Sequence, residues 1–166
     1  GAVAGQVAEQ LAALGMNVRR VSDEVGVASA IKMCRSIMIK GLEALTTECL
    51  STARQYQAEC EVLASLHESF PQMGWDSTLP HYLISRVAEH GLRRSEEMKE
   101  VAKTSTDMGV VPNMSLAIVN AQRGLVDAMV DADLDYPCIE PFDWLHLVDT
   151  LYGSPLTRES LAEEKR

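Results

Sequence analysis

VASAIKMCRSIMIKGLEALTTECLSTARQ, residues 27–55, is the stretch of sequence that decides the fold. It contains no Pro and only one Gly, and apolar or small side chains recur along it at helical spacing. A period of about 3.6 residues over this length predicts one uninterrupted helix of roughly eight turns. We expect its buried stripe to consist of Val27, Ile31, Cys34, Met38, Leu42, Leu45, Cys49 and Ala53.

Similar patterns on both sides of this stretch predict further helices. Gly15 and Gly109 follow two of them, and Pro71, Pro137 and Pro141 interrupt the later part of the chain. Gly favours helix C-termini and Pro cannot continue a helix, so these residues mark where the predicted helices end. We expect helices over residues 2–14, 58–70, 81–108, 112–131 and 142–152, and one short strand over residues 16–21.

The first 25 residues differ from the rest, because one helix and one lone strand cannot form a stable sheet. They are either the end of a domain that lies upstream or an irregular N-terminal arm. We expect residues 26–153 to form one helical domain and residues 154–166 to be a charged C-terminal tail.

Composition also favours an all-α fold, with 46% apolar residues, only 5% aromatic residues and a net charge of −9. A surface this acidic repels nucleic-acid backbones and anionic lipid, so we expect neither partner. No apolar run could span a bilayer and no signal peptide is evident. Since three of the four cysteines lie in helical patterns, as buried free thiols do, we expect a cytoplasmic protein.

Ser29, Lys32 and Ser36 share one face at the start of the long helix, and Arg35 is adjacent. Helix N-termini favour anions, so a Lys there is electrostatically misplaced unless a site requires it. This cluster is therefore a candidate site for proton transfer and anion binding. The alternative is an ordinary surface lysine on a solvated face.

The predicted helix over residues 81–108 carries a polar interruption. Its apolar stripe contains Arg94, and His90, Arg93 and Glu97 flank that position. Polar groups in a buried stripe lower stability unless they find partners. These four residues are either the wall of a pocket or an internal salt-bridge set in which Arg93 or Arg94 pairs with Glu97. No His spacing typical of a metal site occurs, so no metal is expected.

The stretch from Gly26 to Ser36 resembles the β-hydroxyacid dehydrogenase family, which includes 6-phosphogluconate dehydrogenase. In that family a Gly-rich segment precedes a catalytic Lys by six residues, as Gly26 precedes Lys32 here, and an Asn usually follows four residues later. Residues 90–98, followed by Gly109 and Pro112, resemble a phosphogluconate-dehydrogenase-like subgroup. The sequence departs from the usual pattern at Ala28 and Ser36, which stand where a second Gly and the Asn are usual.

The resemblance implies an all-α C-terminal domain that binds substrate and forms a homodimer, preceded in the whole enzyme by a Rossmann domain that binds NAD or NADP. Residues 1–25 would then be the remnant of that domain. The implied catalytic residue is Lys32, which takes the proton of the substrate hydroxyl. The implied substrate-binding residues are Ser29, Arg35, Ser36, His90, Arg93, Arg94 and Glu97.

The implied substrate is a small hydroxyacid, phosphorylated or not. No dinucleotide-binding fingerprint occurs in these 166 residues, so we expect this chain to bind no cofactor and to be inactive alone. The alternative is a non-catalytic helical module that serves interaction or dimerisation.

Overall fold

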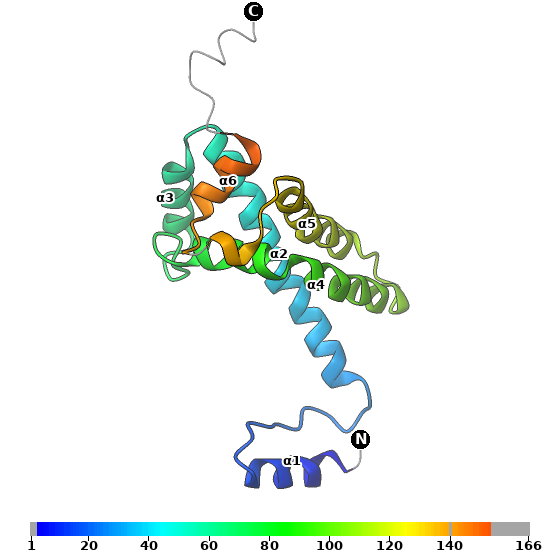
Figure 1. Cartoon of the computed structure of the whole chain (residues 1–166). Helices are drawn as coiled ribbons and strands as arrows, with labels where there is room; N and C mark the ends of the chain where they lie inside the picture. The colour runs from blue at the N-terminus through cyan, green and yellow to red at the C-terminus, as the bar shows by residue number, and fades with distance from the viewer. Residues whose placement is uncertain (1–2, 140, 154–166) are drawn as a thin grey trace, which may run out of the picture.

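The computed structural model describes residues 3–139 and 141–153, and the predicted tail over residues 154–166 lies outside them. The chain is all-α (Figure 1). In order, its helices are α1 (Ala4–Ala13), α2 (Val27–Gln55), α3 (Glu59–Ser69), α4 (Leu79–Asp107), α5 (Asn113–Asp131), the short 3₁₀ helix η1 (Tyr136–Ile139) and α6 (Trp144–Tyr152).

The structure confirms every predicted α-helix to within three residues at each described end, but the predicted strand is wrong. Residues 16–22 have no regular structure, and no strand occurs within the described ranges 3–139 and 141–153. A single strand has no partner for its backbone hydrogen bonds, which explains the difference. The division of the chain at residue 25 stays a prediction.

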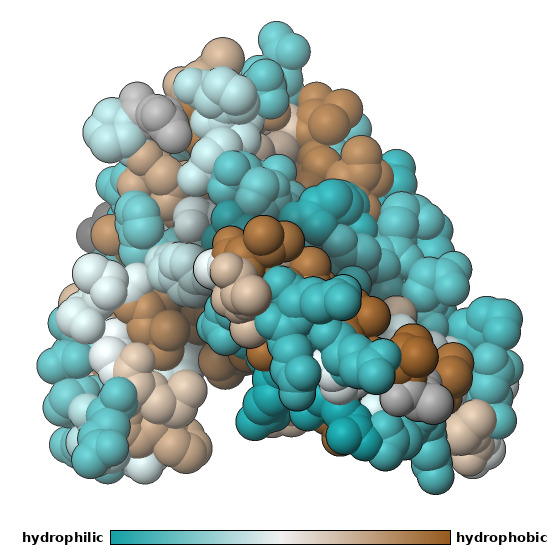
Figure 2. Space-filling model, turned by 90° about the horizontal axis from the view of Figure 1, so that it is seen from below, coloured by the Kyte–Doolittle hydropathy of each residue, from teal (hydrophilic) through white to brown (hydrophobic). Residues whose placement is uncertain are grey.

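The helical bundle consists of α2, α4 and α5, with α3 and α6 at one end (Figure 1). The first turns of α2 extend out of the bundle toward α1, which lies apart from it. None of the residues of α1 is buried, and Figure 2, viewed from that end, shows apolar atoms exposed among polar ones.

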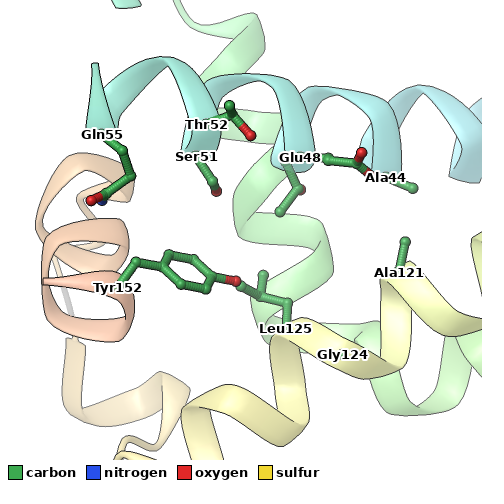
Figure 3. A pocket seen from close by; sticks show the side chains of 10 residues that line it. Ala44, Glu48, Ser51, Thr52, Gln55, Ala121, Gly124, Leu125 and Tyr152 are labelled. Carbon is green, nitrogen blue, oxygen red and sulfur yellow. The ribbon is translucent and has the colours of Figure 1, made fainter. Parts of the chain in front are cut away.

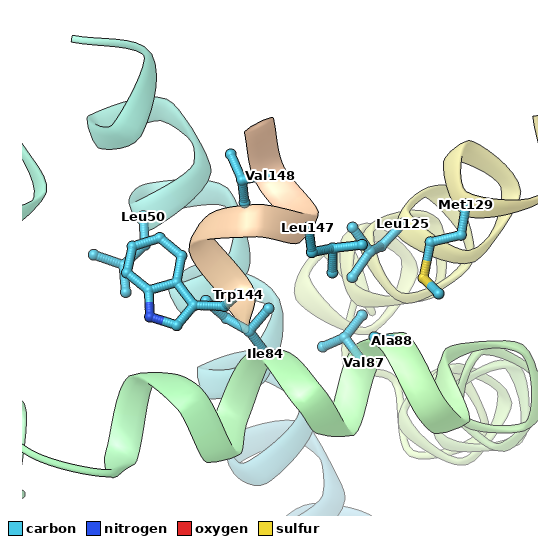
Figure 4. Packing of buried hydrophobic residues seen from close by; sticks show 9 residues of the cluster. All are labelled: Leu50, Ile84, Val87, Ala88, Leu125, Met129, Trp144, Leu147 and Val148. Atoms are coloured by element: carbon cyan, nitrogen blue, oxygen red, sulfur yellow. The ribbon is translucent and has the colours of Figure 1, made fainter. Parts of the chain in front are cut away.

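The main hydrophobic cluster joins α2, α4, α5 and α6 (Figure 4). Trp144, Leu147 and Val148 place one face of α6 against the other three helices. Burying apolar side chains stabilises the fold by about 25 cal/mol per Å² of area removed from water. The other members are Leu50, Ile84, Val87, Ala88, Leu125 and Met129.

Apart from Ala53, the buried face of α2 is not the predicted one. Met38 is 74% exposed and Leu45 is 58% exposed, and Ile31 is also exposed. All four cysteines are exposed, so the interpretation of three of them as buried thiols is wrong as well. The face that packs on the bundle lies on the other side of the helix and is mostly polar or small. Its buried residues are Lys40, Gly41, Glu43, Ala44, Thr46, Thr47, Leu50 and Ala53.

For α4 the predicted stripe is confirmed, and it includes the buried Arg94. Gly91 lies on this stripe where α4 crosses α5. A Cβ atom at position 91 would overlap the carbonyl oxygen of Gln122 and lie 2.8 Å from Cγ2 of Val126. The two helices can therefore approach this closely only because residue 91 has no side chain.

An ion-pair group fastens the last helix to α2. Nε and Nη2 of Arg54 donate to the two carboxylate oxygens of Asp149 at 2.9 and 2.8 Å, and Nη1 donates to Glu59 at 2.7 Å. The hydrogen bonds from Arg54 lower the pKa of Asp149. Because the folded pKa is lowered, this stabilisation is present above the pKa of an unfolded Asp and is lost as the pH falls.

We expect Gly91→Ala to lower the free energy of unfolding by about 1–3 kcal/mol, because the new methyl group overpacks the contact between α4 and α5. Gly124→Ala on α5 is the matched control. A Cβ there meets nothing within 4 Å, so the better helix propensity of Ala should raise stability by up to about 1 kcal/mol. Urea unfolding measures both. Equal effects of the two substitutions would contradict the close approach at Gly91.

Candidate functional site

The first candidate group lies where α2 extends beyond the bundle. Gly26 occupies the N-cap with a φ of 99°, a left-handed conformation that favours Gly, and the helix begins at Val27. Ser29, Lys32 and Arg35 are exposed, and Ser36 is half-buried. Lys32 forms no hydrogen bond or ion pair with any residue that the structure describes. Its amine is therefore free to contact a ligand.

Neighbouring side chains hold this part of α2 against the bundle. Met33 and Ile37 pack against a second hydrophobic cluster that includes Met98, Val101 and Ile118. Lys32 therefore lies at the edge of the packed region, one residue from a side chain that is partly buried. The sequence prediction that Ser29, Lys32 and Ser36 share a helix face agrees with the observed helix.

The second candidate group is an ion-pair network rather than a set of free side chains. Arg93 pairs with Glu97 one turn later on α4, as one of the two sequence interpretations proposed. Arg94 pairs instead with Glu43 on α2, with one Nη1 to Oε1 distance of 2.6 Å. His90 is half-buried, and its Nε2 lies 3.3 Å from a carboxylate oxygen of Glu89.

The buried centre of this network joins three helices. Glu43 is 1% exposed and Gln122 on α5 is fully buried. Nε2 of Gln122 donates to the Glu43 carboxylate at 3.1 Å and to the backbone carbonyl of Lys40 at 3.3 Å. The carboxylate therefore accepts hydrogen bonds from both α4 and α5, which offsets part of the free-energy cost of burying its charge.

Lys40 extends the network toward the surface. Its buried amine donates to Glu97 at 2.6 Å. The hydrogen bond from Lys40 lowers the pKa of Glu97 and outweighs the opposing effect of burial, and Arg93 contributes in the same direction. Glu97 thus bridges a buried cation on α2 and an exposed cation on α4.

Sequence reasoning missed Lys40, Glu43 and Gln122. On α2 the first two lie on the side away from the apolar stripe, so periodicity placed them in solvent. The available signal was Arg94, because a buried guanidinium requires a buried carboxylate from another element. That argument predicts a partner but does not identify it among the 24 acidic residues.

Among the described residues, no hydrogen bond or ion pair joins the first group to the second. Lys40 follows Lys32 by eight residues, which is about 12 Å along the helix axis. The guanidinium of Arg94 is engaged by Glu43, whereas Arg35 has no carboxylate partner among the described residues. Arg35 is therefore better placed than Arg94 to hold an anion near Lys32. Whether any of these residues binds substrate stays a prediction.

Two kinds of feature are absent from the described part of the chain. No three His, Cys, Asp or Glu side chains are grouped there in a way that could hold a metal ion. None of the helices within residues 3–139 and 141–153 has both the length and the apolar character needed to cross a bilayer.

Comparison with known proteins relates part of the chain to a protein family. Residues 53–125 match the family described as "Domain of unknown function (DUF1932)". The solved structure of a conserved hypothetical protein from Sinorhizobium meliloti 1021 is 39% identical and matches with a TM-score of 0.79. This match covers 91% of the chain but 49% of that protein, so the chain spans about half of its relative's length. No curated protein matches.

The fold and these matches define a helical domain of the kind found in NAD(P)-dependent dehydrogenase-like proteins. Residues 53–125 match the DUF1932 family, which is the C-terminal helical domain of 6-phosphogluconate dehydrogenase-like proteins. The family resemblance found in the sequence is thereby confirmed.

Arg94→Met should lower the free energy of unfolding by about 3–5 kcal/mol, because it leaves Glu43 buried without its cation. Adding Glu43→Leu should restore most of this loss, since apolar residues often replace a buried ion pair at no net cost. Arg93→Met removes an exposed pair and serves as the control, with an effect of about 1 kcal/mol or less. Denaturant unfolding of the four proteins measures this. A single variant at Arg94 as stable as the control would contradict the role of the pair.

Proposed function

We propose that this chain is the substrate-binding and dimerising domain of an NAD(P)-dependent dehydrogenase that oxidises a small β-hydroxyacid. The observation that carries the proposal is the free Lys32 at the exposed start of α2, six residues after the left-handed Gly26. The match of residues 53–125 to DUF1932 supports the same reading, because that family is part of dehydrogenase-like proteins.

Each side chain at the start of α2 has a role in this proposal. Lys32 accepts the proton of the substrate hydroxyl, as a positioned general base does. Ser29 and Ser36 hydrogen-bond the substrate and orient that hydroxyl toward Nζ of Lys32. Arg35 holds a carboxylate or phosphate through a charge-assisted contact. NAD or NADP, bound by the cofactor domain of the whole enzyme, supplies the hydride acceptor.

The second candidate group, which lies on α4, has an indirect role. His90 and Arg93 lie at or near the surface, and Glu97 and Lys40 connect Arg93 to α2, whereas His90 lies beside Glu89. Arg94 fixes the register of α2 against α4 through Glu43. Arg94 and Glu97 therefore act as positioning residues, and they set where the first turns of α2 leave the bundle.

The exposed apolar stripe of α2 supports the dimer. Ile31, Cys34, Met38, Leu45 and Cys49 follow one another along the helix and all are exposed. A continuous apolar face of this length on a soluble domain is typical of an interface. A second copy of the chain, related by a two-fold axis, would bury the same stripe on both helices.

A non-catalytic helical interaction module is the second candidate, and the exposure of Lys32 favours it. No described residue faces Lys32 to form a closed site around its amine. The same apolar stripe would then serve interaction alone. Activity of the whole protein separates the two candidates.

In the longer protein that joins this chain to a cofactor domain, Lys32→Ala should lower kcat by about 10²–10⁴-fold on a hydroxyacid identified by a substrate screen. The affinity for NAD(P) should stay unchanged, because no residue of this chain is assigned to the dinucleotide. Lys103→Ala, which removes an exposed lysine of α4, is the control and should retain full activity. Normal turnover without Lys32, or no hydroxyacid oxidised in the screen, would leave the interaction module as the function.

Met38→Glu should convert a dimer to a monomer in sedimentation velocity, because it places a charge in the centre of the apolar stripe. Met108→Glu changes an equally exposed methionine at the end of α4, outside the stripe, and should leave the dimer intact. A wild-type chain that sediments as a monomer at high micromolar concentration would contradict the dimer.

A further inference from the structure

A cavity of about 450 Å³ lies between α2, α5 and the end of α6 (Figure 3). This volume is within the range of about 300–1,000 Å³ that small-molecule sites usually have. Glu48, the acidic residue of its wall, follows Lys32 by sixteen residues, or about 24 Å along the helix axis. The cavity is therefore separate from the candidate catalytic group. Its lining residues are Ala44, Thr47, Glu48, Ser51, Thr52, Gln55, Ala121, Gly124, Leu125 and Tyr152.

One wall of the cavity is apolar and the opposite wall is polar. Ala121 and Leu125 of α5 provide apolar surface, and Gly124 leaves room between them. The hydroxyl and amide groups come from α2, and the Tyr152 side chain reaches from α6 across one end (Figure 3). An apolar wall that faces a polar wall fits a ligand with an apolar body and one polar end.

The polar wall carries acceptors and no cation. No Lys, Arg or His is among the lining residues, and Glu48 is the only acid. The Glu48 carboxylate forms no ion pair with any residue of the described ranges. Beside it, Oγ of Ser51 is buried and has no hydrogen-bond partner among these residues. Nε2 of Gln55 donates to the backbone of Gly153, which leaves its amide oxygen as a further acceptor.

We propose that this cavity binds a small organic ammonium ion, a primary amine with an apolar body. The N–H bonds of an ammonium group match the Glu48 carboxylate and Oγ of Ser51, two acceptors that lie about one turn apart on α2. Anionic ligands would meet an unpaired carboxylate and no cation. A divalent metal would find one carboxylate where it needs several oxygen ligands. The ammonium ion therefore fits this wall better than either.

Benzylamine, which is protonated at pH 7, tests the proposal on the 166-residue chain. Benzyl alcohol and benzoate have the same apolar body with a neutral and an anionic end. In titrations followed by NMR, benzylammonium should shift the amide signals of Glu48, Ser51 and Leu125 and bind at least about tenfold more tightly than either analogue. A charge-assisted hydrogen bond contributes about 1.5–3 kcal/mol, which corresponds to about 10–100-fold in affinity.

Glu48→Gln should weaken benzylammonium about tenfold or more and leave the affinity for benzyl alcohol unchanged. Glu61→Gln is the matched control, since it removes an exposed carboxylate of α3 outside the cavity and makes the net charge less negative by the same amount. It should leave all three affinities unchanged.

Three results would overturn the proposal. One is equal binding of the three probes, and another is an equal loss of affinity in both variants, which would assign the binding to the overall negative charge. The third is a change in sedimentation for Glu48→Gln with no benzylammonium binding to either protein, which would assign the cavity to contact between copies. None of these readouts involves Lys32, so the outcome is independent of the dehydrogenase proposal.

Discussion

The buried ion pair between Arg94 and Glu43 is the interaction on which the arrangement of the long helices depends. Moving two charges from water into a bundle costs free energy that their attraction only partly offsets. The pair is therefore weak evidence for stability, and we propose that it serves the specificity of the helix arrangement. Only one register of α2 against α4 brings the carboxylate to the guanidinium, and Gln122 adds the requirement that α5 lie beside both. Apolar packing around the pair could tolerate other registers, and the charges exclude them.

The helices were predictable where they are long and bounded by Gly or Pro. Which face of a helix is buried was less predictable. The period of residues 27–55 correctly predicted α2, but two faces of that helix compete for burial. The more apolar face, with Met38 and Leu45, is exposed, and the face with Glu43 is buried. Hydrophobicity ranks the faces of one isolated helix, whereas burial depends on which partners α4 and α5 present. The small residues Gly41 and Ala44 let those helices approach, and this is not visible from periodicity.

The candidate site was predictable only as two separate groups. Helical spacing placed Ser29 and Lys32 on one face, and the interrupted stripe of α4 identified Arg94 as a residue that needs a partner. The partner itself was not predictable, because Glu43 is far away in sequence and nothing local distinguishes it from other acids. The sequence also did not show which Lys and Arg side chains form ion pairs and which are free. Ion pairing is a property of the tertiary structure.

The three parts of α2 differ in their contacts with the other helices, and this difference limits how a catalytic site could form there. The middle of the helix is fixed by Glu43 and Lys40, and the end forms one wall of a cavity with α5 and α6. In the first turns Ser29, Lys32 and Arg35 are exposed, and neither Lys32 nor Arg35 has an ion-pair partner among the described residues. A catalytic site there would need a second surface to exclude water and close around the substrate. Because Glu43 and Lys40 fix the middle of α2 to the other helices, the bundle determines the direction in which Lys32 faces that second surface.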